Sequence, residues 1–82
     1  MKTVQISLNS IDKVKSFVND VTKFDYDFDL VSGRYVIDAK SIMGIFTLDR
    51  EQPLLLEIDC DDEAQIAKLN TAIGRFLYHP VH

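Results

Sequence analysis

The chain has 82 residues, 46% of them hydrophobic, which suffices for one sheet and its covering helices but not for two cores. We therefore expect one domain over residues 1–82. The excess of 13 acidic over 9 basic residues gives a net charge of −4, which disfavours binding to nucleic acid or to an anionic membrane. No stretch has the length of a membrane span or the apolar core of a signal peptide, so the sequence predicts a cytoplasmic protein.

The N-terminal part of the chain predicts a strand followed by a helix. Residues 3–8 alternate between polar and apolar side chains, which is the period of a half-buried strand. Ser10 then stands where a helix N-cap is expected. Beyond it, apolar residues recur at steps of three and four, which predicts an amphipathic helix. Its apolar stripe contains Ile11, Val14, Phe17, Val18 and Val21.

A hairpin is expected next. From residue 24 to residue 30 the apolar period returns to two, with Phe24, Tyr26, Phe28 and Leu30 on one face. Ser32 and Gly33 supply the turn, and residues 34–39 return as the paired strand.

Three aspartates on the other face of residues 24–30 imitate the first half of a calcium loop. Asp25, Asp27 and Asp29 have the spacing of its first three ligands. Leu30, however, occupies the place of the required glycine, and Val36 that of the bidentate glutamate. We therefore interpret these aspartates as a solvated strand face and expect no metal site.

A short helix is predicted in the middle of the chain, within residues 38–48. Ser41 has the position of its N-cap, since a serine oxygen can accept a hydrogen bond from a backbone N–H of the first turn. Large apolar residues follow on nearly every side of a helix too short to bury them all, so part of this surface is expected to remain available to a partner. These residues are Ile42, Met43, Ile45 and Phe46.

The last third of the chain predicts a strand and a helix. Pro53 opens a strand in which Leu54, Leu56 and Ile58 point to the core. The acidic run at residues 59–63 suits the start of a helix, where carboxylates complement the dipole. That helix carries an apolar stripe and is expected to stop at Pro80. The stripe contains Ile66, Leu69, Ile73, Phe76 and Leu77.

Cys60 is the only cysteine in the sequence. An internal disulfide and a zinc site built on thiolates are therefore both excluded. We interpret Cys60 as a small, partly buried residue at the end of a strand.

Residues 40–44, with the sequence Lys-Ser-Ile-Met-Gly after a hairpin, resemble the regulatory-serine segment of HPr, the phosphocarrier of the bacterial sugar phosphotransferase system. The order of elements extends the resemblance over nearly the whole chain. It implies an α+β fold, an open-faced two-layer sandwich with the order βαββαβα. In that fold an antiparallel sheet of strand order 1-4-2-3 is covered by helices on one face.

The carrier chemistry of that family is not matched by this sequence. HPr proteins carry phosphate on a histidine at the start of the first helix, with an arginine two residues later. Counted back from Lys23 and Phe24, Ser10 falls at the histidine position and Asp12 at the arginine position. Residues 1–30 contain neither histidine nor arginine. A serine without a general base is a poor nucleophile and an aspartate repels phosphate, so we interpret this as a degenerate carrier site in a chain that is not an enzyme.

Ser41, by contrast, is retained in its segment. The resemblance implies that an HPr-type kinase phosphorylates this serine and that the modified protein binds a transcriptional regulator, as in catabolite repression. Crh, a relative, also lacks the carrier histidine and keeps the serine. The expected contact surface is Lys40, Ile42, Met43, Ile45 and Phe46. No cofactor is expected.

Three interpretations remain open at this point. The first is a non-catalytic regulatory or protein-binding module switched at Ser41, and the plain alternative for Ser41 is an N-cap with no further role. The second is a phosphocarrier with a displaced acceptor, His79 or His82, because the end of the last helix should lie beside the start of the first. The third is a structural domain that forms homo-oligomers through a sheet edge or the short helix.

Overall fold

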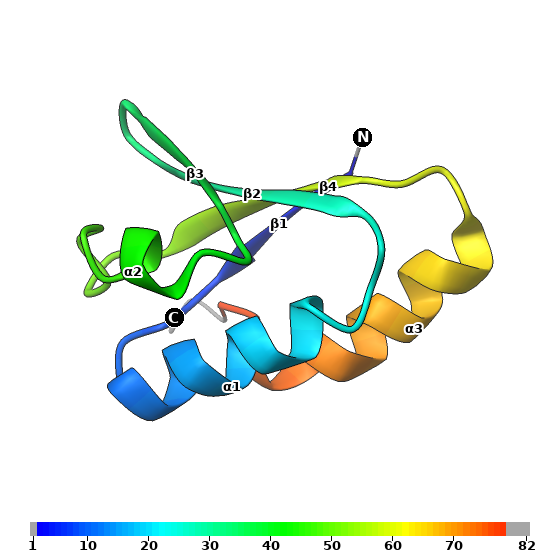
Figure 1. The fold of residues 1–82 in the computed structure, drawn as a ribbon, viewed down its shortest axis with the longest axis horizontal. Helices are drawn as coiled ribbons and strands as arrows, with labels where there is room; N and C mark the ends of the chain where they lie inside the picture. Colours follow the sequence, from blue (N-terminus) through cyan, green and yellow to red (C-terminus); the bar gives the residue numbers. More distant parts are fainter. Residues whose placement is uncertain (1, 79–82) are drawn as a thin grey trace, which may run out of the picture.

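The fold was obtained as a computed structural model, which describes residues 2–78 (Figure 1). Within this part, strands and helices follow one another in the order predicted from the sequence. The elements are β1 (Lys2–Ile6), α1 (Ile11–Val21), β2 (Asp27–Ser32), β3 (Tyr35–Asp38), α2 (Ile42–Ile45), β4 (Leu54–Asp59), α3 (Glu63–Ile73) and a 3₁₀ turn, η1 (Gly74–Phe76).

The sheet has the order β1-β4-β2-β3, and each neighbouring pair is antiparallel. α1 and α3 lie side by side on one face of it, and α2 lies beside β3 (Figure 1). The opposite face carries no helix in this part of the chain. The predicted α+β open-faced sandwich with strand order 1-4-2-3 is confirmed.

α1 forms where the apolar period predicted it. Ser10 is its N-cap, and Val14, Phe17 and Val21 are buried against the sheet. The predicted stripe was wrong at its first residue, because Ile11 is 57% exposed. Ile11 occupies the first turn, which extends past the edge of the core.

The hairpin is shorter than predicted at its start. β2 begins at Asp27, whereas the strand was expected from residue 24. Phe24 and Tyr26 belong to the connection after α1 and only pack against the core from outside. The turn is as expected: Gly33 has a φ of 59°, a conformation that glycine adopts without steric cost.

α3 begins at Asp62, whose carboxylate accepts hydrogen bonds from the N–H groups of Ala64 and Gln65. The expected continuous helix up to Pro80 was wrong, since α3 ends at Ile73 and a 3₁₀ turn follows. Phe76 in that turn packs edge-to-face on Phe17 of α1, with ring centroids 5.7 Å apart. The packing of Phe76 draws the chain back toward the sheet instead of along the helix axis.

One hydrophobic core lies between the sheet and the helices. It includes Ile6 and Leu8, Phe28 and Leu30, Leu54, Leu56 and Ile58 from the sheet side, Val14, Phe17, Ile66, Leu69 and Ile73 from the helices, and Cys60 at the end of β4. This set confirms the predicted inward face of β4 and, for α3, the predicted burial of Ile66, Leu69 and Ile73. Leu77 of the predicted stripe lies beyond α3 and is half-buried. No helix among the residues described is both long and apolar enough to cross a membrane.

Candidate functional site

Ser41 begins α2 through a side-chain cap. Its Oγ accepts a hydrogen bond from the backbone N–H of Gly44 at 3.2 Å. The chain enters the helix from a turn built by Asp38: the Asp38 carbonyl accepts the Ser41 N–H at 2.9 Å, and its carboxylate accepts the Lys40 N–H at 2.9 Å. The predicted N-cap is confirmed, and the end of β3 positions it.

Gly44 lies where α2 packs closely against Ile37 of β3. A Cβ placed there would lie 2.6 Å from Cγ2 of Ile37 in β3 and 3.1 Å from Oγ of Ser41. A contact under 3 Å forces a shift of one of the two groups. The glycine therefore allows α2 to pack against β3 while its N–H reaches the capping oxygen.

The apolar residues of α2 divide between core and surface. Met43 is 74% exposed, whereas Ile42 and Phe46 are half-buried against the core. Ile45 is fully buried. Its inclusion in the expected contact surface was therefore wrong, because the fourth residue of this short helix points to the sheet.

Lys40 is engaged within the fold. Its Nζ donates a hydrogen bond to the carbonyl of Phe24 at 2.7 Å and lies 5.5 Å from the centroid of the Phe28 ring. This contact ties the start of α2 to the connection between α1 and β2. While this hydrogen bond is formed, the Lys40 ammonium group is not free to contact a partner. Lys40 could join the expected contact surface only after the hydrogen bond to Phe24 breaks.

Arg50 belongs to the same surface, although the sequence did not predict it there. Its guanidinium lies over the ring of Phe46, 5.1 Å from the centroid. Its Nε is buried and makes no hydrogen bond to any residue that the structure describes. Arg50 lies in a polar loop, and no periodic pattern distinguishes it from its neighbours, so the sequence held no signal for this contact.

Ser10 and Asp12 lie at the exposed start of α1. Oγ of Ser10 accepts a hydrogen bond from the N–H of Lys13 at 3.2 Å, so Ser10 acts as a cap here. No histidine or arginine precedes residue 34, and Asp12 places a carboxylate in the first turn. A carboxylate in this place disfavours an incoming phosphate.

The end of the described chain lies beside the end of β1. Ser7 donates its N–H to the carbonyl of Phe76 at 2.7 Å, and Tyr78 donates its N–H to that of Gln5 at 2.9 Å. Leu77 forms a β-bridge with Ile6. The expected placement of the end of the last helix near the start of α1 is confirmed, whereas His79 and His82 lie outside the described residues.

A shallow hollow of about 220 Å³ separates the start of α1 from η1. Asp12, Lys13, Ser16, Arg75 and Phe76 line it. Arg75 forms an ion pair with Asp20 at 2.8 Å, with its guanidinium 4.8 Å from the centroid of the Phe76 ring. Asp20 and Arg75 are 55 residues apart, and no pattern in the sequence predicted that they form an ion pair.

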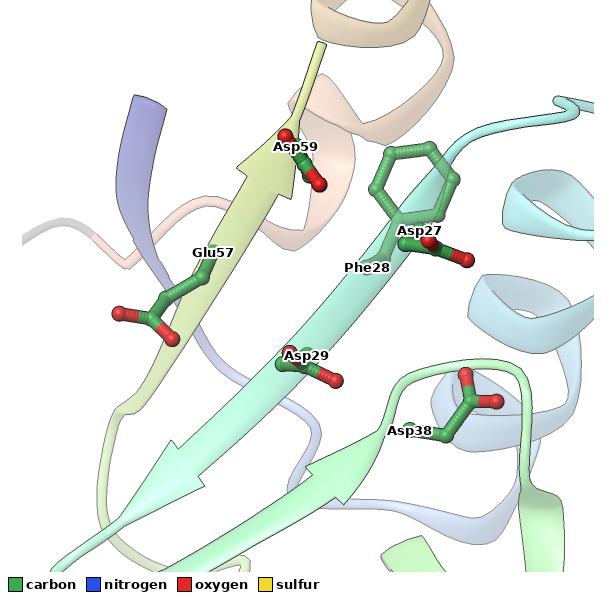
Figure 2. A pocket seen from close by; sticks show the side chains of 6 residues that line it. All are labelled: Asp27, Phe28, Asp29, Asp38, Glu57 and Asp59. Carbon is green, nitrogen blue, oxygen red and sulfur yellow. The ribbon is translucent and has the colours of Figure 1, made fainter. Parts of the chain in front are cut away.

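The helix-free face of the sheet is acidic. Figure 2 shows Asp27, Asp29, Asp38, Glu57 and Asp59 around an open depression next to Phe28. Asp29 is directly opposite Asp38 on one side and Glu57 on the other, and Asp27 is opposite Asp59. Like charges directly opposite in a sheet destabilise it. No group of three or more potential ligands in residues 2–78 is arranged to hold a metal ion.

Comparison with known proteins finds similar solved structures but no similar sequence family. No family model and no curated protein matches the sequence. The crystal structure of HPr-C-His from Thermoanaerobacter tengcongensis is 28% identical, with a TM-score of 0.70 over 89% of this chain and 90% of that one. A phosphocarrier protein HPr from Bacillus anthracis is 25% identical, with a TM-score of 0.66 over 87% of this chain and 92% of the other.

The chain is HPr-like. A third similar structure is Crh of Bacillus subtilis, described as a catabolite repression protein that forms a dimer by domain swapping. It is 23% identical, with a TM-score of 0.61 over 93% of this chain and 90% of that one, and this likeness shows the fold. The predicted HPr-like fold is thus confirmed over most of the chain, and this likeness supports a relationship to the phosphocarrier family.

Proposed function

We propose that this HPr-like protein is a non-catalytic regulatory module, which binds a protein partner and is switched by phosphorylation of Ser41. The observation that carries the proposal is the place of Ser41, whose oxygen caps α2 next to the exposed Met43. A phosphate at a helix start is stabilised by the dipole, by about 0.3–1 kcal/mol at an exposed site. We therefore expect the fold to accept the modification.

The contact surface in this proposal is built around Met43. Ile42 and Phe46 flank it as half-buried supports, and Arg50 lies over Phe46. Methionine adapts its shape to a partner, and an arginine beside a new phosphate adds a donor for a charged hydrogen bond. We propose an HPr-type kinase and a transcriptional regulator as partners, in the cytoplasm of a bacterium, in a role related to catabolite repression.

The absence of carrier chemistry in the proposal rests on the start of α1. Ser10 uses its oxygen as a cap, and Asp12 stands where HPr proteins are expected to have an arginine. Phosphoryl transfer needs an activated nucleophile and positive charge around the transferred group. Neither is supplied by Ser10 and Asp12.

The direct test is phosphorylation with an HPr-type kinase and ATP, followed by mass spectrometry of the peptides. The expected result is one phosphate on Ser41, lost in the Ser41→Ala variant. Ser10→Ala is the matched control, since Ser10 caps a helix in the same way and should leave the modification unchanged. A phosphate that persists in Ser41→Ala, or no phosphate at all, contradicts the proposal.

A second candidate function is a phosphocarrier with His79 or His82 as acceptor. One observation favours it: the bonds of Ser7 and Tyr78 bring the end of the described chain next to the start of α1, where Lys13 and Arg75 line a hollow. Against it, Arg75 is paired with Asp20, and Asp12 lines the same hollow. Labelling from phosphoenolpyruvate with the general transferase of the sugar phosphotransferase system decides between the two candidates.

A further inference from the structure

The outer edge of β3 has no role in the proposed function. β3 is the last strand in the sheet order, so its outer side pairs with no strand among residues 2–78. Tyr35 and Val36 lie on it with 68% and 62% of their surfaces exposed. An edge strand with exposed apolar side chains and free backbone groups is a template for pairing with another strand.

The direction of the free backbone groups follows from one hydrogen bond. Ala39 donates its N–H to the carbonyl of Phe28 at 2.8 Å, and in an antiparallel pair alternate residues point both backbone groups toward the partner strand. Ile37 therefore also faces β2, whereas Val36 presents both its N–H and its C=O to the free edge. Asp38 presents its N–H there, because its carbonyl already accepts the Ser41 N–H. A strand that adds to this edge would bond to both backbone groups of Val36 and to the N–H of Asp38.

We propose that the occupant of this edge is a second copy of the chain, whose β3 pairs antiparallel with the first around a two-fold axis at Val36. In an antiparallel pair, a residue whose backbone groups point to the free edge must stand opposite such a residue in the other copy. Because these residues alternate along β3, the two-fold axis has to pass through a residue and not between two residues. With the axis at Val36, Arg34 of each copy stands at the level of Asp38 of the other. The pairing thus forms one hydrogen-bonded valine pair flanked by two pairs of opposite charge.

Other registers lack this charge complementarity. An axis at Arg34 or at Asp38 sets like charges opposite each other. An axis at Ile37 sets Arg34 opposite Lys40, which is again a like pair. An axis at Tyr35 leaves both charges without an opposite partner, so the register at Val36 is the one that the charges favour.

The acidic face of the sheet supplies a further reason for this register. Asp38 stands directly opposite Asp29 in β2, and in residues 2–78 neither Asp38 nor Arg34 forms an ion pair. An arginine from the second copy would place a positive charge beside these carboxylates. Since β3 has four residues, the interface is small and the dimer is expected to be weak.

The experiment is sedimentation equilibrium of the full chain at concentrations up to about 1 mM, where weak association is measurable. The wild type should associate to dimers. Arg34→Glu and Val36→Lys should each weaken the dimer by about tenfold or more, because they set like charges across the axis. Thr3→Lys on β1 is the matched control for Val36→Lys, since it adds the same charge at an exposed position of the opposite edge strand.

A charge-swapped mixture tests the register itself. Arg34→Glu and Asp38→Lys should each dimerise poorly alone, whereas their equimolar mixture should form a heterodimer, because both cross-strand pairs then have opposite charges. Asp38 also accepts the Lys40 N–H, so the melting temperature of each variant is measured first. If Asp38→Lys fails to fold, Arg34→Glu and Val36→Lys carry the test by themselves.

Three results would overturn the inference. One is a wild type that stays monomeric throughout the concentration range. Another is association that Arg34→Glu and Val36→Lys leave unchanged, which would assign the contact to another surface, such as an exchanged strand. The third is an equal loss of association in Thr3→Lys, which would make the effect one of net charge. The inference does not require Ser41 phosphorylation, because the pairing is centred on Val36. Asp38, whose carbonyl accepts the Ser41 N–H, is the one residue that it shares with the turn before α2.

Discussion

Ser10 and Ser41 begin α1 and α2 with the same bond, in which the side-chain oxygen accepts the backbone N–H three residues later at 3.2 Å. The surroundings of the two caps differ. Ser10 is exposed and is followed by Asp12, whereas Ser41 is half-buried and is preceded by Lys40. The same local motif thus has a carboxylate in the first helical turn at α1 and a lysine directly before the cap at α2.

The two helices also depend on their caps to different degrees. α1 has 11 residues and buries a full apolar face, so tertiary packing holds it in place. α2 has four residues and is held by Ile45, by Gly44 and by the cap of Ser41. A change at the start of α2 is therefore expected to alter the local surface, whereas the same change at α1 alters mainly the stability.

Gly44→Ala should have the largest effect, because it breaks the contact that distinguishes the two helix starts. The new Cβ would meet Ile37 at 2.6 Å, and such overpacking costs about 1–3 kcal/mol in the free energy of unfolding. Urea unfolding measures the loss. The matched control is Gly74→Ala, where nothing lies within 4 Å of the new Cβ and a small gain is expected. Equal stability of the two variants would contradict the close packing of α2 on β3.

Removing each cap compares the two serines directly. Ser10→Ala and Ser41→Ala should each lower the free energy of unfolding by about 0.5–2 kcal/mol. Ser41→Asp should melt at or above the temperature of Ser41→Ala at low salt, because an aspartate caps the helix and complements its dipole. Ser10→Asp should recover less, since Asp12 lies in the same turn. A Ser41→Asp variant less stable than Ser41→Ala would show that the cap assignment is wrong.

Lys40→Met tests whether the cation beside Ser41 belongs to the fold. The variant loses the hydrogen bond from Nζ to the Phe24 carbonyl and should be destabilised by about 0.5–1.5 kcal/mol. Lys15→Met on the exposed side of α1 is the control and should stay within about 0.5 kcal/mol of the wild type. If the two lysine variants unfold at the same temperature, the Lys40 side chain does not stabilise the fold and is available to a partner.

The smallest effect concerns Tyr26, in the segment that Lys40 holds through Phe24. Partial burial raises the pKa of the Tyr26 hydroxyl above its ordinary value of 10.0, and Cys60, Asp62 and Asp25 act in the same direction. Because the pKa of this hydroxyl is lower in the unfolded chain, the unfolded chain releases the proton at a lower pH than the folded one. The free energy of unfolding therefore falls as the pH rises above the unfolded pKa. Tyr26→Phe should therefore lose less stability than the wild type between neutral and alkaline pH. Parallel alkaline losses in the two proteins would argue against a raised pKa.

Most of the fold was predictable because local patterns carry it. The alternation of Leu54, Leu56 and Ile58 defined the inner face of β4, and the spacing of Val14, Phe17 and Val21 defined that of α1. The strand order came from the family resemblance. The wrong predictions concern the ends of helices and strands, namely Ile11, the start of β2 and the end of α3. At such ends the periodicity of apolar residues does not show whether a side chain still packs against the core.

The candidate site was predictable only in part. Ser41 was found by its cap position, but the burial of Ile45 depends on how α2 turns over β3. The contact of Lys40 with Phe24 and that of Arg75 with Asp20 join segments far apart in the sequence. Such contacts depend on tertiary packing, and neither composition nor spacing encodes them visibly.

The central claim, an HPr-like protein without carrier chemistry, is tested most directly by labelling the full chain from phosphoenolpyruvate with the general transferase of the sugar phosphotransferase system. An authentic HPr serves as the positive control in the same reaction, and acid treatment distinguishes phosphohistidine, which is acid-labile, from phosphoserine. We expect the control to be labelled and this chain to remain unlabelled. An acid-labile label on His79 or His82 would contradict this expectation and would establish the displaced carrier instead.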